Sequence, residues 1–130
     1  MACNRPIDWE ALVPRKLAMY YESNDLVRFP PRWRVEPVDA TAVVGDSVVF
    51  DCQAEGYPQP LIRWKKASGE NSASRNFKSI ISNYHIQTLE NGSLSIKDLT
   101  EEDRGHYLCE AANGVGADLS TVVKLSVHGR

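Results

Sequence analysis

Short runs of alternating hydrophobic and polar residues begin near Pro30 and continue to the end of the chain. The clearest run is SVVFDCQAEG (47–56), where every second residue is hydrophobic: Val48, Phe50, Cys52 and Ala54. A β-strand points successive side chains to opposite faces, so this period of two predicts a half-buried strand. The stretch LIRWKK (61–66) predicts a second strand, with Ile62 and Trp64 facing inward and Arg63 and Lys65 facing outward.

The remaining runs are separated by turn residues. YPQP (57–60) contains two prolines, which fix φ and withhold a donor. The runs 84–89 and 93–99 flank Glu-Asn-Gly, which predicts a hairpin because Asn and Gly tolerate positive φ. Its second arm should direct Leu94 and Ile96 inward and Ser93, Ser95 and Lys97 outward. HYLCEAA (106–112) and ADLSTVVKLSV (117–127) complete an all-β pattern typical of a sandwich or barrel.

Residues 1–28 lack a sustained period and are expected to form an N-terminal tail, left from cloning or from a neighbouring domain. Residues 29–130 are expected to form one domain, since 130 residues leave little room for a second. Within it, the polar stretch 67–76 is rich in Gly and Ser and predicts an exposed loop.

Composition narrows the classes of function. Hydrophobic residues make up 42% of the chain, enough for a packed core. The 15 basic and 17 acidic residues form no long run of one sign, which argues against nucleic acid or an anionic membrane as the main partner. No stretch reaches the ~18 apolar residues of a membrane helix. The N-terminus also lacks the apolar core of a secretory signal.

The chemistry of a catalytic or metal site is missing from the sequence. His106 lies three residues before Cys109, which on a strand places the two side chains on opposite faces. No C-x-x-C pair offers zinc ligands, and the cluster EED (101–103) lacks the spaced oxygens of a calcium loop. We therefore expect no catalytic, metal or cofactor-binding residue, no small-molecule substrate, and no enzyme activity.

Several motifs occur together in a recognisable order. Cys52, Trp64 and Cys109 are followed by N-G-x-G (113–116), and D-x-G-x-Y-x-C spans 103–109. This constellation resembles an I-set immunoglobulin domain. The stretches FPPRWRVEPVD, GYPQPLIRWKKASGE and GHYLCEAANGVGADLS are more narrowly similar to mid-ectodomain immunoglobulin repeats of the Dscam family of cell adhesion molecules, its arthropod members in particular.

The resemblance implies an antiparallel β-sandwich of seven or eight strands with one inter-sheet disulfide, between Cys52 and Cys109. Closing a separation of 57 positions stabilises the fold by about 4 kcal/mol on the entropic model. The third cysteine, Cys3, is left as an unpaired thiol or a link between two chains. Asp103 and Gly105 would shape the turn before Tyr107, which would form a tyrosine corner. The expected core around the bridge is Phe50, Trp64, Leu94, Ile96 and Tyr107.

The resemblance also implies a function and a location. A disulfide needs an oxidising compartment, so the domain is expected in the extracellular part of a single-pass plasma-membrane protein, or secreted. Expected partners are proteins: an identical copy on an opposing cell, for recognition between neurons, and neighbouring immunoglobulin domains. One alternative is a receptor or immune-recognition domain for a heterologous ligand, and another is a structural module of a giant intracellular muscle protein, which would leave Cys52 and Cys109 reduced. In that family contacts often use the A-B-E-D sheet, whose outward residues here are Val49, Asp51, Gln53, Ser95 and Lys97.

Two further positions each have two interpretations. Asn91 begins an N-glycosylation sequon, Asn-Gly-Ser, but the hairpin turn alone also favours Asn-Gly. His85 occupies a position where many immunoglobulin domains have an Arg that pairs with the Asp of the D-x-G-x-Y-x-C turn. A His85–Asp103 contact, weaker and dependent on pH, is one hypothesis, and an exposed, inert histidine is the other.

Overall fold

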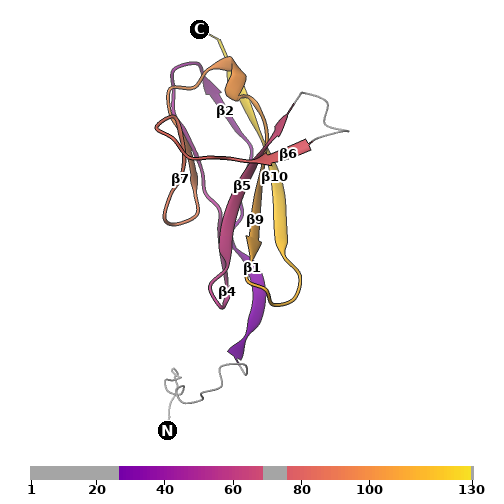
Figure 1. The fold of residues 1–130 in the computed structure, drawn as a ribbon. Helices are drawn as coiled ribbons and strands as arrows, with labels where there is room; N and C mark the ends of the chain where they lie inside the picture. The colour runs from indigo at the N-terminus through magenta and orange to yellow at the C-terminus, as the bar shows by residue number, and fades with distance from the viewer. Residues whose placement is uncertain (1–26, 69–75, 130) are drawn as a thin grey trace.

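The computed structural model describes residues 27–68 and 76–129, whose strands form two packed layers (Figure 1). The predictions for Cys3 and for most of the 67–76 loop lie outside the described residues. Since only Val27 and Arg28 of the first 28 residues are described, the tail stays a prediction. In the described part, β1 begins at one end of the sandwich and β10 ends at the opposite end (Figure 1).

The first layer is a five-stranded sheet in the order β2-β10-β9-β5-β6. Every neighbouring pair is antiparallel except β2 and β10, which run parallel. The strands span Ala40–Val43 (β2), Leu119–His128 (β10), Gly105–Ala112 (β9), Leu61–Ser68 (β5) and Asn76–Ser79 (β6). In β9 the predicted alternation is confirmed, because Tyr107, Cys109 and Ala111 are fully buried.

The second layer combines an antiparallel pair, β1-β4, with a three-stranded antiparallel sheet, β3-β8-β7. Its strands span Phe29–Val35 (β1), Gln53–Tyr57 (β4), Val48–Phe50 (β3), Leu94–Ile96 (β8) and Ile86–Thr88 (β7). The pairing of β7 with β8 confirms the hairpin predicted from Glu-Asn-Gly. A short 3-10 helix, η3, covers Glu101–Asp103 before β9.

The predicted strand 47–56 is divided in the structure between β3 and β4. Its first half pairs with β8 and its second half with β1. The division lies at Asp51 and Cys52, where β8 gives way to the hairpin turn at Gly92 and Ser93. The chain thus changes its partner strand at Cys52, the residue that forms the disulfide.

The parallel pairing of β2 is a departure from the purely antiparallel sandwich expected from the sequence. Between β1 and β2 the chain crosses from the second layer to the first, and the buried Pro37 lies in this crossing. Proline offers no N–H to continue a ladder, which favours ending β1 there. Asp39 then accepts a hydrogen bond from the backbone N–H of Lys124 at 2.8 Å, which holds the crossing against β10.

The core lies between the layers and is built around aromatic rings. Phe50 has its ring centroid 6.0 Å from that of Trp64 and 5.8 Å from that of Tyr107. Burying each such ring stabilises the fold by about 1.5–3 kcal/mol. All five residues expected in the core are at most 3% exposed: Phe50, Trp64, Leu94, Ile96 and Tyr107.

Candidate functional site

The cysteines of the two layers are joined. Cys52, between β3 and β4, forms a disulfide with Cys109 of β9, and neither residue is exposed to solvent. The predicted inter-sheet disulfide is therefore present. Because both sulfurs are buried and bonded to each other, Cys109 is a structural residue in this structure and offers no thiolate.

The hairpin turn packs against the backbone of Cys52, beside this disulfide. The Trp64 indole N–H donates a hydrogen bond to the carbonyl oxygen of Gly92 at 2.8 Å, so the buried indole has its polar atom satisfied. Gly92 has φ +97°, and a Cβ there would lie 2.6 Å from the carbonyl oxygen of Cys52. Only glycine fits this approach. We call Cys52, Cys109, Trp64 and Gly92 the disulfide hub.

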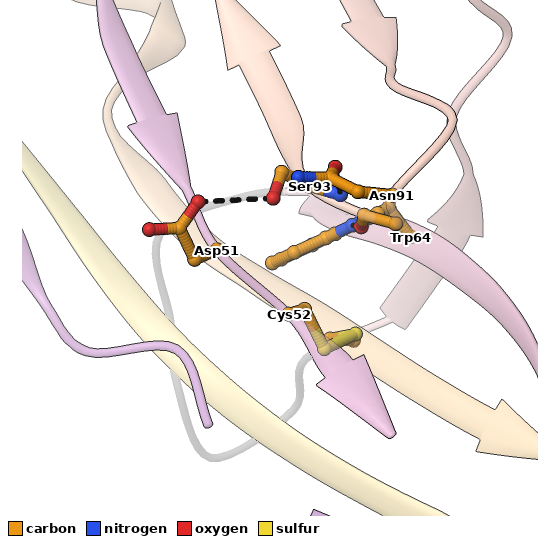
Figure 2. Close-up of a disulfide and its surroundings, with 7 residues drawn as sticks. Asp51, Cys52, Trp64, Asn91 and Ser93 are labelled. Atoms are coloured by element: carbon orange, nitrogen blue, oxygen red, sulfur yellow. Dashed lines mark hydrogen bonds between the residues drawn. A yellow bond between two sulfur atoms is a disulfide. The ribbon is translucent and has the colours of Figure 1, made fainter. Parts of the chain in front are cut away.

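A polar contact closes the hub on its solvent side. The Ser93 hydroxyl donates to Oδ1 of Asp51 at 3.0 Å, as Figure 2 shows. Ser93 itself has no exposed surface, so the prediction that it faces outward into solvent is wrong. The reason is local: the turn lies against the β3–β4 junction, and Asp51 covers the hydroxyl.

A second polar cluster surrounds Asp103, which is buried at the end of η3. Its Oδ2 accepts the backbone N–H of Thr100 at 2.8 Å, and the Tyr107 hydroxyl donates to its backbone carbonyl, as a tyrosine corner requires. Burial of the phenol, with the nearby Asp103 carboxylate, raises the pKa of Tyr107 far above its ordinary value. The neighbouring Gly105 has φ +135°, which suits the turn before β9.

His85 also contacts this cluster. Its Nε2 lies 2.9 Å from Oδ1 and 3.1 Å from Oδ2 of Asp103. The contact hypothesised from the sequence is therefore present, and the alternative of an exposed, inert histidine is wrong. The dependence of this contact on pH stays a prediction. We call Asp103, Tyr107 and His85 the Asp103 corner.

The outward face of the second layer carries the residues expected to bind a partner. Val49 is 51% exposed, Asp51 and Lys97 are exposed, and Gln53 is half-buried. Ser95 differs from the expectation, because it is only 9% exposed. It lies on the central strand β8, directly between Val49 and Gln87 of the neighbouring strands, and these longer side chains shield it.

Sequence reasoning missed an ion pair on the same face. Arg32 Nε of β1 lies 2.7 Å from Oε2 of Glu55 in β4. Glu55 continues the alternation of Val49, Asp51 and Gln53, and this pattern could have identified Glu55 as a further outward residue of the same face. The β1–β4 register that brings Arg32 opposite Glu55 has no local signature. We call the face formed by Arg32, Val49, Asp51, Glu55 and Lys97 the outer strip.

Other kinds of site are not seen in the part of the chain that the structure describes. Residues 27–68 and 76–129 contain no group of three or more His, Cys, Asp or Glu side chains placed to hold a metal ion. None of their helices is long and apolar enough to cross a membrane.

The comparisons with known proteins agree with this arrangement. The model of the family described as "Immunoglobulin domain" matches residues 30–113. The chain belongs to the immunoglobulin-domain family. The predicted fold class, an immunoglobulin-like sandwich with an inter-sheet disulfide, is thereby confirmed. Domains of this kind in adhesion molecules are binding modules and a non-enzymatic class of protein.

The relatives of this immunoglobulin domain are cell adhesion molecules. The chain is 46% identical over 110 residues to the cell adhesion molecule DSCAM of Gallus gallus, covering 85% of this chain and 5% of that protein. It is 41% identical over 102 residues to Dscam2 of Drosophila melanogaster, covering 78% of this chain and 5% of that protein. The resemblance to Dscam repeats is confirmed, while these identities do not favour an arthropod source.

A solved structure supports the same relationship. The crystal structure of DSCAM isoform 1.30.30, N-terminal eight Ig domains, superposes with a TM-score of 0.70 at 37% identity. The match covers 76% of this chain and 12% of that chain. The chain thus spans a small part of the relatives it matches, and it is homologous to single immunoglobulin domains of DSCAM.

Proposed function

We propose that this chain is an extracellular module of a cell-surface recognition protein and that it contributes to homophilic contact between cells through the outer strip. The homology to DSCAM domains supports a cell adhesion module. The buried disulfide supports an oxidising, extracellular location. The homophilic contact and the neuronal setting are parts of the proposal that depend on the surface described below.

The observation that carries the proposal is the order of charges along the outer strip. Val49 pairs with Ser95 near the middle of the β3–β8 ladder. Asp51 lies two residues beyond Val49 in one direction, and Lys97 lies two residues beyond Ser95 on the antiparallel neighbour. An exposed apolar side chain thus has a negative charge on one side and a positive charge on the other.

This order is self-complementary. In a two-fold symmetric contact each surface residue i meets j of the partner copy, and j meets i. A two-fold axis near Val49 would place Lys97 of one copy opposite Asp51 of the other, twice. Exposed ion pairs contribute only about 0.2–1 kcal/mol each. A single module therefore associates weakly, and several modules in one chain would add their contributions.

The experiment is a charge-swap series measured by sedimentation equilibrium. Asp51→Lys alone and Lys97→Asp alone would bring like charges together and should weaken self-association. The double variant Asp51→Lys/Lys97→Asp restores complementarity and should recover it. The matched control is Lys124→Asp, an exposed lysine of β10 in the other layer, which should leave self-association unchanged.

Two outcomes would contradict the proposal. The first is a chain that stays monomeric at the highest accessible concentration. The second is a double variant that associates no better than the single ones. If the chain is monomeric but strip variants weaken binding to a different protein, the alternative of a heterologous ligand replaces the homophilic contact.

A further inference from the structure

The hairpin turn between β7 and β8 contains the sequence Asn91-Gly92-Ser93. It is the only Asn-x-Ser/Thr sequon in the chain, which has seven asparagines. Such a sequon accepts an N-linked glycan when its asparagine amide is reachable in a secreted protein. The turn gives Gly92 a structural reason to be present, so the question is whether the asparagine amide and the serine hydroxyl are also available.

The asparagine amide is available. Asn91 is exposed, and its Oδ1 accepts the backbone N–H of Ser93 at 2.9 Å. Among the described residues no hydrogen bond engages its Nδ2, the atom that a glycan would occupy. A sugar on Nδ2 would leave the Oδ1 contact in place, and the folded domain can therefore carry a glycan at this position without losing the turn.

The serine hydroxyl is not available once the domain has folded. Ser93 is 0% exposed, and its hydroxyl donates to Asp51 across the gap between the turn and the β3–β4 junction (Figure 2). Gly92, the middle residue of the sequon, is held between Cys52 and the Trp64 indole. An enzyme that must contact all three residues in an extended conformation cannot do so while the hub is formed.

We propose that Asn91 is an N-glycosylation site that is modified only before β8 pairs with β3. The donor is an oligosaccharide linked to a lipid diphosphate. The bond between the anomeric carbon and the diphosphate oxygen breaks, a bond from that carbon to Nδ2 forms, Nδ2 loses one proton, and the lipid diphosphate leaves. The inference rests on the proposed passage of the chain through the secretory pathway, although not on self-association.

The position of the site links it to the outer strip. The Ser93 hydroxyl contacts Asp51, which belongs to the outer strip. A glycan on Asn91 would be attached two residues before Ser93. Folding buries the Ser93 hydroxyl, which is the group that the transferase must contact to recognise the sequon. Glycosylation and formation of the disulfide hub therefore compete in time, and the first to occur decides the state of Asn91.

The first arm of the test uses the whole 130-residue chain secreted from eukaryotic cells behind a signal sequence. The expected result is a gel-mobility shift that peptide-N-glycosidase removes, leaving aspartate at position 91 in the peptide mass spectrum. Asn91→Asp is the matched control, since its carboxylate still accepts the Ser93 N–H but cannot be glycosylated. A secreted wild-type chain without the shift would overturn the site.

The second arm tests the timing. The folded, oxidised chain and the reduced, urea-unfolded and rapidly diluted chain are each given to solubilised oligosaccharyl transferase with its lipid-linked donor. We expect product from the unfolded chain and at least a tenfold lower yield, as an order-of-magnitude expectation for a closed sequon, from the folded one. Equal yields would overturn the timing. Because neither arm measures self-association, failure here is distinct from failure of the proposed function.

Discussion

The disulfide hub and the Asp103 corner both join the two layers of the sandwich, but they do so by different means. The hub combines a covalent bond with a buried hydrogen bond between neutral groups, Trp64 to Gly92. The corner depends on the buried residue Asp103. Its carboxylate contacts His85 and accepts the Thr100 N–H, and its backbone carbonyl accepts the Tyr107 hydroxyl. The hub therefore contains no ionisable group, while the corner contains the Tyr107 phenol, whose pKa is raised by burial.

The difference also concerns tolerance to added atoms. At the hub, the Cys52 carbonyl oxygen and the Ile62 side chain lie so close to Gly92 that a Cβ there would overlap the carbonyl oxygen. At the corner, a Cβ on Gly105 would meet only the end of the flexible Lys66 side chain, at 3.6 Å. One junction is filled by rigid groups and the other by movable ones, and three measurements test this contrast.

The largest effect is expected from removing the disulfide. The double variant Cys52→Ala/Cys109→Ala should lose about 2–5 kcal/mol of the free energy of unfolding, because the unfolded chain gains freedom over the closed loop and two buried atoms leave a cavity. Urea denaturation followed by tryptophan fluorescence measures the loss. Wild-type protein in reductant should show a similar decrease, and an unchanged midpoint in reductant would contradict the assignment.

The next effect compares the two glycines. Gly105→Ala should cost about 1–3 kcal/mol, the strain of a non-glycine residue at its positive φ. Gly92→Ala carries similar strain and also forces the Cys52 carbonyl to move, which should add about 1 kcal/mol, the lower end of the cost of overpacking. The two free energies of unfolding are measured side by side in urea. Equal losses would show that the hub yields as readily as the corner.

The smallest effect concerns the hydroxyl of the corner. Tyr107→Phe should cost about 0.5–1.5 kcal/mol at neutral pH, the net contribution of one hydrogen bond, because the Asp103 carbonyl loses its buried donor. The effect should depend on pH. The folded-state pKa of Tyr107 is raised above its ordinary value of 10.0, so the protonated phenol favours the folded state. This contribution is complete below about pH 10 and is lost as the pH rises further.

The measurement is the difference in unfolding free energy between wild type and Tyr107→Phe, taken from pH 8 to pH 11, a range of roughly one to two units around the ordinary tyrosine pKa. The difference should shrink above pH 10. Burial lowers the pKa of Lys66, against the opposing effect of Asp103. Because Lys66 is present in both proteins, its contribution cancels in the difference. A difference that stays constant to the alkaline limit would contradict a buried phenol.

Much of this molecule could be predicted from local pattern. The period of two placed Phe50, Trp64 and Tyr107 in the core, and Glu-Asn-Gly placed the β7–β8 hairpin. These predictions succeeded because a strand's inward face and a tight turn depend on neighbours in the sequence. The His85–Asp103 contact was also found, although it came from comparison with immunoglobulin domains.

The predictions that failed concern contacts between residues that are far apart in the sequence. Ser93 and Ser95 alternate correctly with Leu94 and Ile96, yet both are buried. Ser95 lies on the central strand β8 between longer side chains, and Ser93 lies in the turn, where Asp51 covers its hydroxyl. The Arg32–Glu55 pair depends on the register of β1 against β4. Likewise, the parallel position of β2 depends on where the chain crosses layers, which only the assembled sandwich determines.

The parallel pairing of β2 with β10 has a mechanical consequence. β1 begins at one end of the sandwich, β10 ends at the other, and β2 follows β1 closely in the chain (Figure 1). Tension applied between the two ends pulls β2 and the end of β10 in opposite directions along their shared axis. The ladder from Ala40–Leu125 to Val43–His128 is then loaded in shear, so that its hydrogen bonds must break together rather than one after another. This edge of the sheet would therefore resist further stretching once β1 has separated from β4.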